Sequence, residues 1–330
     1  MIKKIIFALI ALGLVLATAA FSAKRFVAQQ WQLPRDAQVT QVTVNPGDTY
    51  YAVASRVFEQ SFAGEWWLRA WFRFNPETAG VRSGTFAVDS SLSLEGLSDV
   101  LRNGTEIQLQ VTLVEGETFQ QFWQKLNGTE GIVASELTEA EVAELLGSER
   151  DKLEGLLLPE TYFFVTDTPA EEIVKRAYQA LEQVLEAQWQ ARAEDLPINN
   201  AYEALILASI IEKETGAKHE RPRIASVFVN RLNIGMRLQT DPTVIYGMGD
   251  RYNGRIRRAD LREATAYNTY VIPALPPTPI AMASEDAIHA ALNPEHSPYF
   301  YFVAKGGGEH YFSKTLKEHN RAVRKYILGK

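Results

Sequence analysis

Residues 205–216, which read Leu-Ile-Leu-Ala-Ser-Ile-Ile-Glu-Lys-Glu-Thr-Gly, constrain the fold more than any other stretch of this chain. Their apolar side chains recur at helical spacing, which predicts a buried helix that the rest of the chain must cover. At about 100° per residue, Glu214 falls within the apolar stripe, whereas Glu212 falls on another side of the helix. We therefore expect these two carboxylates to have different surroundings.

The position of Glu214 makes it a candidate catalytic acid. A carboxyl group held against aliphatic side chains loses hydration of its charged form, so its pKa rises. If it stays protonated near neutral pH, it can act as a general acid. In the simpler interpretation, Glu214 occupies the last helical turn before Gly216 with its carboxylate in water. That placement would oppose the helix dipole and cost stability.

The overall composition is that of a globular protein with room for two domains. The chain has 330 residues, of which 46% are hydrophobic and 22% are charged. A net charge of −6 gives no reason to expect a nucleic-acid partner. The chain has no cysteine, and its five histidines include no pair at metal-ligand spacing. We therefore expect neither a metal nor a cofactor.

An apolar run near the N-terminus, from Ile5 to about Ala23, predicts a membrane segment. Its length is close to the ~20 residues that span a bilayer. A cleavable signal peptide is the alternative, but the run exceeds the usual apolar length of roughly 7–15 residues. Basic residues flank both sides, so charge does not decide the orientation. We expect an uncleaved anchor at residues 1–24, followed by a linker at residues 26–40.

Three segments of the N-terminal half combine alternating residues, a turn and helical spacing, which is typical of a strand–turn–helix unit. They lie at residues 41–58, 84–101 and 110–126. The tryptophans and phenylalanines of residues 66–74 suit core packing on a helix, with sugar stacking as the less favoured interpretation. Further helices are expected at residues 129–153, 169–192 and 224–232, and a hairpin or mobile loop at the glycines of 306–308.

Two polar segments follow the glutamate-bearing helix and suit a ligand site. Residues 236–243 place Gln239 and Asp241 in a loop pinned by Pro242. Asp241 also suits the cap of a helix that starts at Pro242. Residues 264–270 form a run of hydroxyls and an amide. Such groups over an apolar backing favour a neutral, hydroxyl-rich substrate such as a glycan.

Four further segments are distinctive: Ala-Ser-Ile-Ile-Glu-Lys-Glu-Thr (208–215), Met-Arg-Leu-Gln-Thr-Asp-Pro-Thr-Val-Ile-Tyr-Gly (236–247), Thr-Ala-Tyr-Asn-Thr-Tyr (265–270) and Leu-Pro-Pro (275–277). In these segments and their order, the sequence from about residue 156 to its end resembles the YceG-like (MltG) family of membrane-anchored endolytic murein transglycosylases. The resemblance implies an α+β fold with an N-terminal membrane helix and a small LysM-like α/β module around residues 84–110. It also implies a mainly helical, lysozyme-like catalytic domain with short strands at residues 156–330, after an N-terminal periplasmic region at residues 25–155.

The resemblance also implies the site residues. Lytic transglycosylases more broadly carry a catalytic Glu followed by Ser, then a glutamine-bearing loop and an Ala-Tyr-Asn motif. This chain has Glu214 followed by Thr rather than Ser, and the other two features come in the same order. The implied catalytic residue is Glu214, and the implied substrate-binding residues are Thr215, Gln239, Asp241, Tyr246, Tyr267 and Asn268.

The activity implied by the resemblance is cleavage of the bond between N-acetylmuramic acid and N-acetylglucosamine inside glycan strands, with 1,6-anhydro ends. The implied partners are peptidoglycan strands, the inner membrane and, from the family alone, peptidoglycan synthases. The implied location is a single-pass inner-membrane protein with a cytoplasmic N-terminus. Two alternatives stay open: a hydrolytic muramidase that uses Asp241 as a second acid, and a non-catalytic glycan-binding scaffold.

Overall fold

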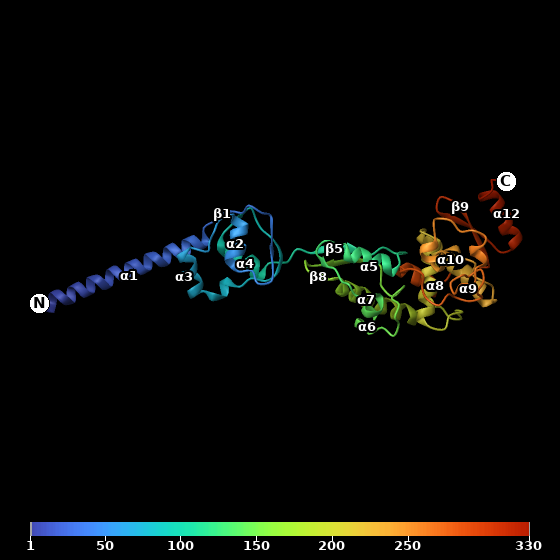
Figure 1. Ribbon diagram of the computed structural model, residues 1–330, viewed down its shortest axis with the longest axis horizontal. Helices are drawn as coiled ribbons and strands as arrows, with labels where there is room; N and C mark the ends of the chain where they lie inside the picture. Colours follow the sequence, from blue (N-terminus) through green and yellow to red (C-terminus); the bar gives the residue numbers. More distant parts are fainter. Residues whose placement is uncertain (1, 330) are drawn as a thin grey trace. The chain divides into compact units, whose positions relative to one another are not determined.

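The computed structural model describes residues 2–329 and combines helices with short two-stranded sheets (Figure 1). The mixed helix-and-strand class expected from the sequence is therefore confirmed. Residues 1–109 form one compact unit, here unit 1, and residues 110–330 form another, unit 2. The expected functional regions 25–155 and 156–330 do not coincide with these units, and they stay a prediction.

The first helix, α1 (Ile2–Gln32), is long and apolar enough to cross a membrane. It does not end with the apolar run, because Val27 and Trp31 in its last turns are buried in the core of unit 1. The expectation of a linker over residues 26–40 is therefore wrong for its first part. The helix stops just before Pro34, where the residue preceding a proline is disfavoured from helical geometry.

Unit 1 packs aromatic residues around the end of α1. Trp31 stacks on Trp71 with ring centroids 4.9 Å apart, and Trp67 is also buried, so core packing is confirmed for most of this aromatic cluster. The elements of the unit are β1 (Arg35–Asp36) paired with β4 (Ser91–Leu92), β2 (Gln41–Val44) antiparallel to β3 (Gly84–Ala87), α2 (Tyr50–Phe58), α3 (Trp66–Phe74), a 3-10 turn (Pro76–Ala79) and α4 (Leu94–Asn103).

The first part of unit 2 places three helices beside two small sheets. The helices are α5 (Phe119–Asn127), α6 (Glu139–Leu145) and α7 (Ala170–Gln190). The strands are β5 (Leu109–Thr112) paired with β7 (Thr161–Phe164), and β6 (Ile132–Val133) parallel to β8 (Thr168–Pro169). The predicted strand–turn–helix units at 41–58, 84–101 and 110–126 all contain the expected strand and helix.

The long helix predicted over residues 129–153 is wrong in extent, since only α6 forms within it. Gly131 and Gly147 have positive φ angles of 84° and 69°, which interrupt helical backbone on both sides. Thr138 starts α6 with a complete capping box. The helix-favouring composition of residues 129–153 therefore yields a helix of only seven residues, which lies between the two glycines.

The second part of unit 2 is built around α8 (Ala201–Glu214), whose residues 204–212 are all buried. It is packed by α7, α9 (Arg221–Asn233), α10 (Asp241–Met248) and α11 (Glu285–Leu292). The glycines at 306–308 close a hairpin of β9 (Tyr301–Gly306) and β10 (Glu309–Ser313), against which α12 (Leu316–Tyr326) packs. Short 3-10 turns occur at Lys218–Glu220, Gly249–Arg251 and Asp260–Arg262.

Candidate active site

Glu214, the last residue of α8, lies at a polar cavity of about 430 Å³ in unit 2. The cavity forms where the end of α8, the α9–α10 loop, the β9–β10 hairpin and α12 meet. Two predicted substrate-binding residues, Gln239 and Asp241, line it together with Glu214. The other lining residues are Arg231, Leu238, Thr240, Tyr270, Tyr301, Phe302, Val303, Ala304, His310, Leu316 and His319.

The surroundings of Glu214 favour its protonated form. Burial is the largest effect and raises the pKa of its carboxyl group, and the negative charge of Asp241 acts in the same direction. A hydrogen bond donated by the Thr240 hydroxyl to Glu214 Oε1 opposes the shift, as do the more distant His310 and Arg231. The net effect is a raised pKa, which favours the protonated form that a general acid needs.

The loop that carries Gln239 is held in an unusual backbone conformation. Gln239 has a φ angle of 49°, a region that costs a non-glycine residue on the order of 1–3 kcal/mol. Its N–H donates to the carbonyl of Thr269 at 3.1 Å, and the next N–H, of Thr240, donates to Thr269 Oγ1 at 3.0 Å. Arg231 fixes the start of the loop by donating to the Leu238 carbonyl at 2.5 Å. The backbone that presents Gln239 to the cavity is therefore fixed from two sides.

Asp241 is the first residue of α10, and Thr240 is the N-cap. The expectation that Asp241 itself caps a helix starting at Pro242 is therefore off by one residue. The side chain of Asp241 instead accepts a hydrogen bond from the Tyr270 hydroxyl at 2.6 Å. This position in the first turn of α10 is one that suits an acidic side chain.

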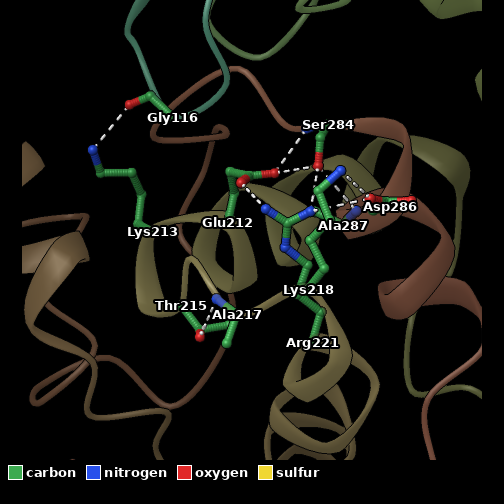
Figure 2. Close-up of polar contacts among 10 residues, drawn as sticks. All are labelled: Gly116, Glu212, Lys213, Thr215, Ala217, Lys218, Arg221, Ser284, Asp286 and Ala287. Atoms are coloured by element: carbon green, nitrogen blue, oxygen red, sulfur yellow. Dashed lines mark hydrogen bonds and ion pairs between the residues drawn. The ribbon is translucent and has the colours of Figure 1, made fainter. Parts of the chain in front are cut away.

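Glu212 has a different environment, as the helical phase predicted (Figure 2). It forms an ion pair with Arg221 at 2.5 Å, and both side chains are only 3% exposed. Its second oxygen accepts from the N–H of Ser284 at 2.9 Å. Arg221 also lies 3.7 Å from Asp286, which pairs with Lys218. The bond from Ser284, the N-cap of α11, ties that helix to α8, and the ion pair with Arg221 ties α9 to α8, so Glu212 serves the fold.

The remaining predicted site residues do not line the cavity of Glu214. Tyr246 and Tyr267 line a second cavity, of about 720 Å³. Asn268 is fully buried, and its amide donates to the carbonyls of Asp260 and Glu263 at 3.0 and 2.7 Å. Thr215 is buried and accepts from the N–H of Ala217 at 3.0 Å. In this structure Asn268 and Thr215 support the loops around the site.

Several residues of the first cavity escaped the sequence analysis. Thr240 lay inside the quoted loop segment, but no pattern singled out its hydroxyl as the partner of Glu214. Arg231 lies in the last turn of a predicted helix, where it reads as an ordinary surface residue. His310 comes from the distant hairpin and is held by Glu220 at 2.8 Å. Only the packing of separate segments brings these side chains together.

An acid of raised pKa at a cavity lined by hydroxyl, amide and carboxylate groups defines a site suited to general acid catalysis on a polar substrate. Within residues 2–329, no group of three or more His, Asp or Glu side chains is arranged to hold a metal ion.

Comparison with known proteins identifies the family. The chain belongs to the YceG-like family, whose sequence model matches residues 42–325. It is 34% identical to the endolytic murein transglycosylase of Bacillus subtilis, over 76% of this chain and 75% of the relative. It is 29% identical to the enzyme of the same name from Streptococcus pneumoniae, over 76% of this chain but only 51% of that relative.

A solved structure agrees with this assignment. The crystal structure of a YceG-like protein from Listeria monocytogenes aligns with 88% of this chain and 99% of its own, with 27% sequence identity and a TM-score of 0.52. The family match begins at residue 42, so it extends well before residue 156, where the region of resemblance was expected to begin.

Proposed function

We propose that this chain is a membrane-anchored endolytic lytic transglycosylase of peptidoglycan. The observation that carries the proposal is Glu214, whose pKa is raised by burial at a polar cavity, in a chain of the YceG-like family. Relatives named endolytic murein transglycosylase match it over three quarters of its length. The proposed substrate bond joins N-acetylmuramic acid to N-acetylglucosamine within a glycan strand.

In the proposed mechanism, Glu214 acts first as acid and then as base. Its proton passes to the glycosidic oxygen as the bond from C1 of the muramic residue breaks, which releases the 4-hydroxyl of N-acetylglucosamine. The C6 oxygen of the same muramic residue then bonds to C1, and its proton returns to Glu214. No water is consumed, and the strand ends in a 1,6-anhydro ring.

One carboxyl group suffices for this route because the attacking hydroxyl belongs to the reacting sugar. An intramolecular nucleophile reaches an effective concentration of about 10⁵ M or more in good geometry, which free water does not match. Gln239 and Asp241, which share the cavity with Glu214, are proposed to bind and orient the sugar by hydrogen bonds. Thr215, Tyr246, Tyr267 and Asn268 remain proposed substrate-binding or supporting residues.

The placement in the cell is proposed from α1. A single N-terminal apolar helix fits a single-pass anchor in the inner membrane, with the N-terminus in the cytoplasm and units 1 and 2 in the periplasm. The proposed regions are the anchor (1–24), a region with a LysM-like module (25–155) and the catalytic domain (156–330). Peptidoglycan synthases are proposed partners on the family resemblance alone.

Two other functions predict different outcomes with peptidoglycan: a muramidase makes a different product, and a scaffold makes none. A hydrolytic muramidase would need Asp241 to activate water, which usually requires carboxyl groups roughly 6.5–9.5 Å apart on opposite faces of the sugar. The bond that Asp241 accepts from Tyr270 favours a fixed, hydrogen-bonding role instead. A non-catalytic scaffold would have no use for an acid of raised pKa at a polar cavity.

Mass spectrometry of purified sacculi digested by the full chain tests the proposal. We expect fragments that end in 1,6-anhydro-N-acetylmuramic acid, lighter by one water than hydrolysis products and resistant to borohydride reduction. Asp241→Asn should weaken binding without changing these ends. Reducible ends that disappear in Asp241→Asn would assign the chain as a muramidase. Sacculi that stay intact would favour the non-catalytic scaffold.

A further inference from the structure

One side of α3 is exposed although it carries a large aromatic ring. The opposite side of the helix, with Trp67 and Leu68, is buried in the core of unit 1. At about 100° per residue, Trp66, Arg69 and Arg73 fall within about 60° of one another around the helix axis. All three are exposed, and Trp66 is 59% exposed. The fold of unit 1 therefore does not account for the ring of Trp66.

The ring of Trp66 forms an exposed aromatic pair with a side chain of α1. It stacks on Phe26, with ring centroids 6.1 Å apart and planes inclined by 15°, and Phe26 is itself 43% exposed. Five residues further along each helix, Trp71 stacks on Trp31. The two helices therefore lie side by side (Figure 1) and run in the same direction, which puts Trp66 at the end of α3 nearest the membrane segment. Adjoining exposed rings of this size mark a surface that contacts a partner.

The length of the apolar run places this aromatic pair at the membrane surface. At about 1.5 Å per residue, Ile5–Ala23 is about as long as the ~30 Å hydrocarbon core of a bilayer. Phe26 follows Ala23 after about 4.5 Å of helix. The headgroup layer adds roughly 5–7 Å on each side of the core. Phe26 and Trp66 therefore fall at headgroup depth, where tryptophan is enriched in membrane proteins.

Four basic side chains accompany the aromatic pair. Lys24 and Arg25 end the membrane segment of α1, and Arg69 and Arg73 lie on the exposed side of α3. Among the described residues 2–329, none of these four forms an ion pair with an acidic side chain. Arg69 donates to the carbonyl of Ala63 at 2.8 Å, which leaves further N–H groups of its guanidinium for another acceptor. Phosphate is suited to this role, since guanidinium groups bind it with two parallel hydrogen bonds.

The acid next to Trp66 in the sequence does not neutralise this surface. Glu65 is half-buried, and its carboxylate accepts a hydrogen bond from Trp67 Nε1 at 2.6 Å. It also attracts the positive charge of Arg35. The negative charge of Glu65 is therefore used on the core side of α3, and the exposed side keeps its positive charge.

We propose that Phe26, Trp66, Arg69 and Arg73, here called the juxtamembrane surface, contact the phospholipid headgroups of the membrane that α1 spans. The two rings lie at headgroup depth, and the two guanidinium groups bind lipid phosphates. The inference rests on the proposed anchor and adds a second attachment, from a helix that starts forty residues after Phe26. Because the last turns of α1 belong to the core of unit 1, contact by α3 holds unit 1 in one orientation on the bilayer.

A fluorescent label at position 70 tests this contact. Ala70 lies one helical turn after Trp66 and is partly exposed, and the chain has no cysteine, so Ala70→Cys gives a single labelling site. The full chain carries a nitrobenzoxadiazole dye there and is reconstituted in liposomes of phosphatidylglycerol and phosphatidylcholine. We expect emission at shorter wavelength, and stronger quenching by nitroxide on lipid headgroups, than from the same dye at Ala87→Cys, an exposed position of β3. Equal emission and equal quenching at the two positions would overturn the inference.

Variants of the chain labelled at position 70 separate membrane contact from damage to the fold. Trp66→Gln, and the double change Arg69→Gln with Arg73→Gln, should each move the emission toward that of the dye at position 87. Trp66→Tyr keeps a ring that suits the membrane surface, and Arg69→Lys with Arg73→Lys keeps the charge, so both should retain the parent's emission. Because these side chains are exposed, the urea midpoints should stay unchanged. Unchanged emission in Trp66→Gln and in the double glutamine variant would contradict the proposed contact.

Two other occupants of the juxtamembrane surface predict different results. If a second copy of this chain covers it, the emission should depend on the protein-to-lipid ratio and should shift in concentrated detergent solution without lipid. If the surface stacks on sugars instead, chitotetraose, four linked N-acetylglucosamine units, should shift the emission in detergent. Either result would replace lipid as the partner and overturn the inference.

Separate readouts keep this inference distinct from the proposed function. If the chain resists alkaline extraction from membranes while the dye at position 70 stays in water, the anchor stands and the lipid contact of α3 fails. If the dye contacts lipid but cells release a soluble chain that begins near Ala20, the juxtamembrane surface stands and the proposed anchor fails. Digestion of sacculi in detergent reports the proposed activity independently, and the variants of α3 should release 1,6-anhydro fragments as the parent does.

Discussion

At the scale of single residues, the end of α8 holds two glutamates, Glu212 buried and Glu214 half-buried, that have different electrostatic surroundings. Burial and the charge of Asp241 favour the protonated form of Glu214, whereas Arg221 and Ser284 bind Glu212 as a carboxylate. Glu214→Gln removes the transferable proton and should lower the rate of fragment release by about 10³-fold, within the usual range for a general acid. Release of soluble fragments from sacculi measures this rate.

The matched change Glu212→Gln should affect stability instead of chemistry. It leaves Arg221 buried without its closest ionic partner, and breaking a buried pair typically costs about 3–5 kcal/mol. We therefore expect a lower melting temperature and, below that temperature, activity within about tenfold of the parent. Equal loss of activity in both variants at unchanged melting temperatures would contradict the separate roles.

The hydroxyl of Thr240 is expected to tune Glu214. Its hydrogen bond stabilises the ionised form, so Thr240→Val should raise the pKa of Glu214 further. The alkaline limb of the pH–rate profile should then move to higher pH, while Thr240→Ser should leave it in place. An unchanged alkaline limb in Thr240→Val would show that this hydroxyl does not act on the catalytic proton.

Glu154 should make the fold more stable in mild acid than at alkaline pH. Its pKa is raised from 4.5 to about 7, so the folded state binds a proton that the unfolded state has already released between these values. Stability from this group is complete below pH 4.5 and is lost as the pH rises through 7. At about 1.4 kcal/mol per pKa unit, the loss amounts to about 3 kcal/mol.

Urea unfolding at a series of pH values measures the effect of Glu154. Glu154→Gln keeps an acceptor for the N–H of Phe119 and a polar partner for Tyr246, but it cannot ionise. The variant should therefore lack the fall in the free energy of unfolding between pH 5 and 8 that the parent shows. A parallel fall in both proteins would mean that other groups cause it.

Part of the site was predictable because it depends on local sequence. Helical phase separated Glu214 from Glu212, and the resemblance placed Gln239 and Asp241 in a loop that meets Glu214 at one cavity. The division between two cavities was not predictable, because Tyr246 and Tyr267 stand near Gln239 and Asp241 in sequence but line a different cavity. Which side of α10 faces which cavity depends on tertiary packing that no local pattern encodes.

At the scale of elements, two of the helices of unit 2 were predicted close to their observed bounds. The helix expected over 169–192 is α7, and the one expected over 224–232 lies within α9. Composition alone failed over 129–153, where glycines at positive φ limit α6. Composition also mispredicted the segment after residue 25 as a linker. The two side chains that enter the core of unit 1, Val27 and Trp31, lie there among polar residues.

The last turns of α1 are expected to stabilise unit 1. Trp31 is 1% exposed and contacts the rings of Tyr50, Trp71 and Phe72. Trp31→Ala leaves a cavity among these rings and should cost about 3–5 kcal/mol. Trp66→Ala, at a side chain that is 59% exposed, should change stability by less than about 0.5 kcal/mol. Urea unfolding of the two variants in detergent tests the difference, and similar midpoints would contradict it.

At the scale of the whole molecule, α1 joins a membrane segment to a folded unit without a break. Its apolar run and the two side chains in the core of unit 1 belong to one continuous helix. Signal peptidase acting near Ala20 would leave residues 21–32, and with them Val27 and Trp31, attached to unit 1. The fold of unit 1 is therefore compatible with either fate of the apolar run, and the N-terminus of the processed protein distinguishes them.

Cysteine labelling in intact cells tests both the anchor and its orientation. The chain has no cysteine, so one introduced thiol is a unique reporter. A peptidoglycan enzyme must place its folded units outside the cytoplasm, although Lys3 and Lys4 on one side and Lys24 and Arg25 on the other balance the flanking charge. A membrane-impermeant maleimide should therefore label Ser61→Cys, an exposed position of unit 1, but not Lys3→Cys, and both proteins should stay with the membranes. The reverse labelling would overturn the orientation, and a soluble product beginning near Ala20 would replace the anchor with a cleaved signal peptide.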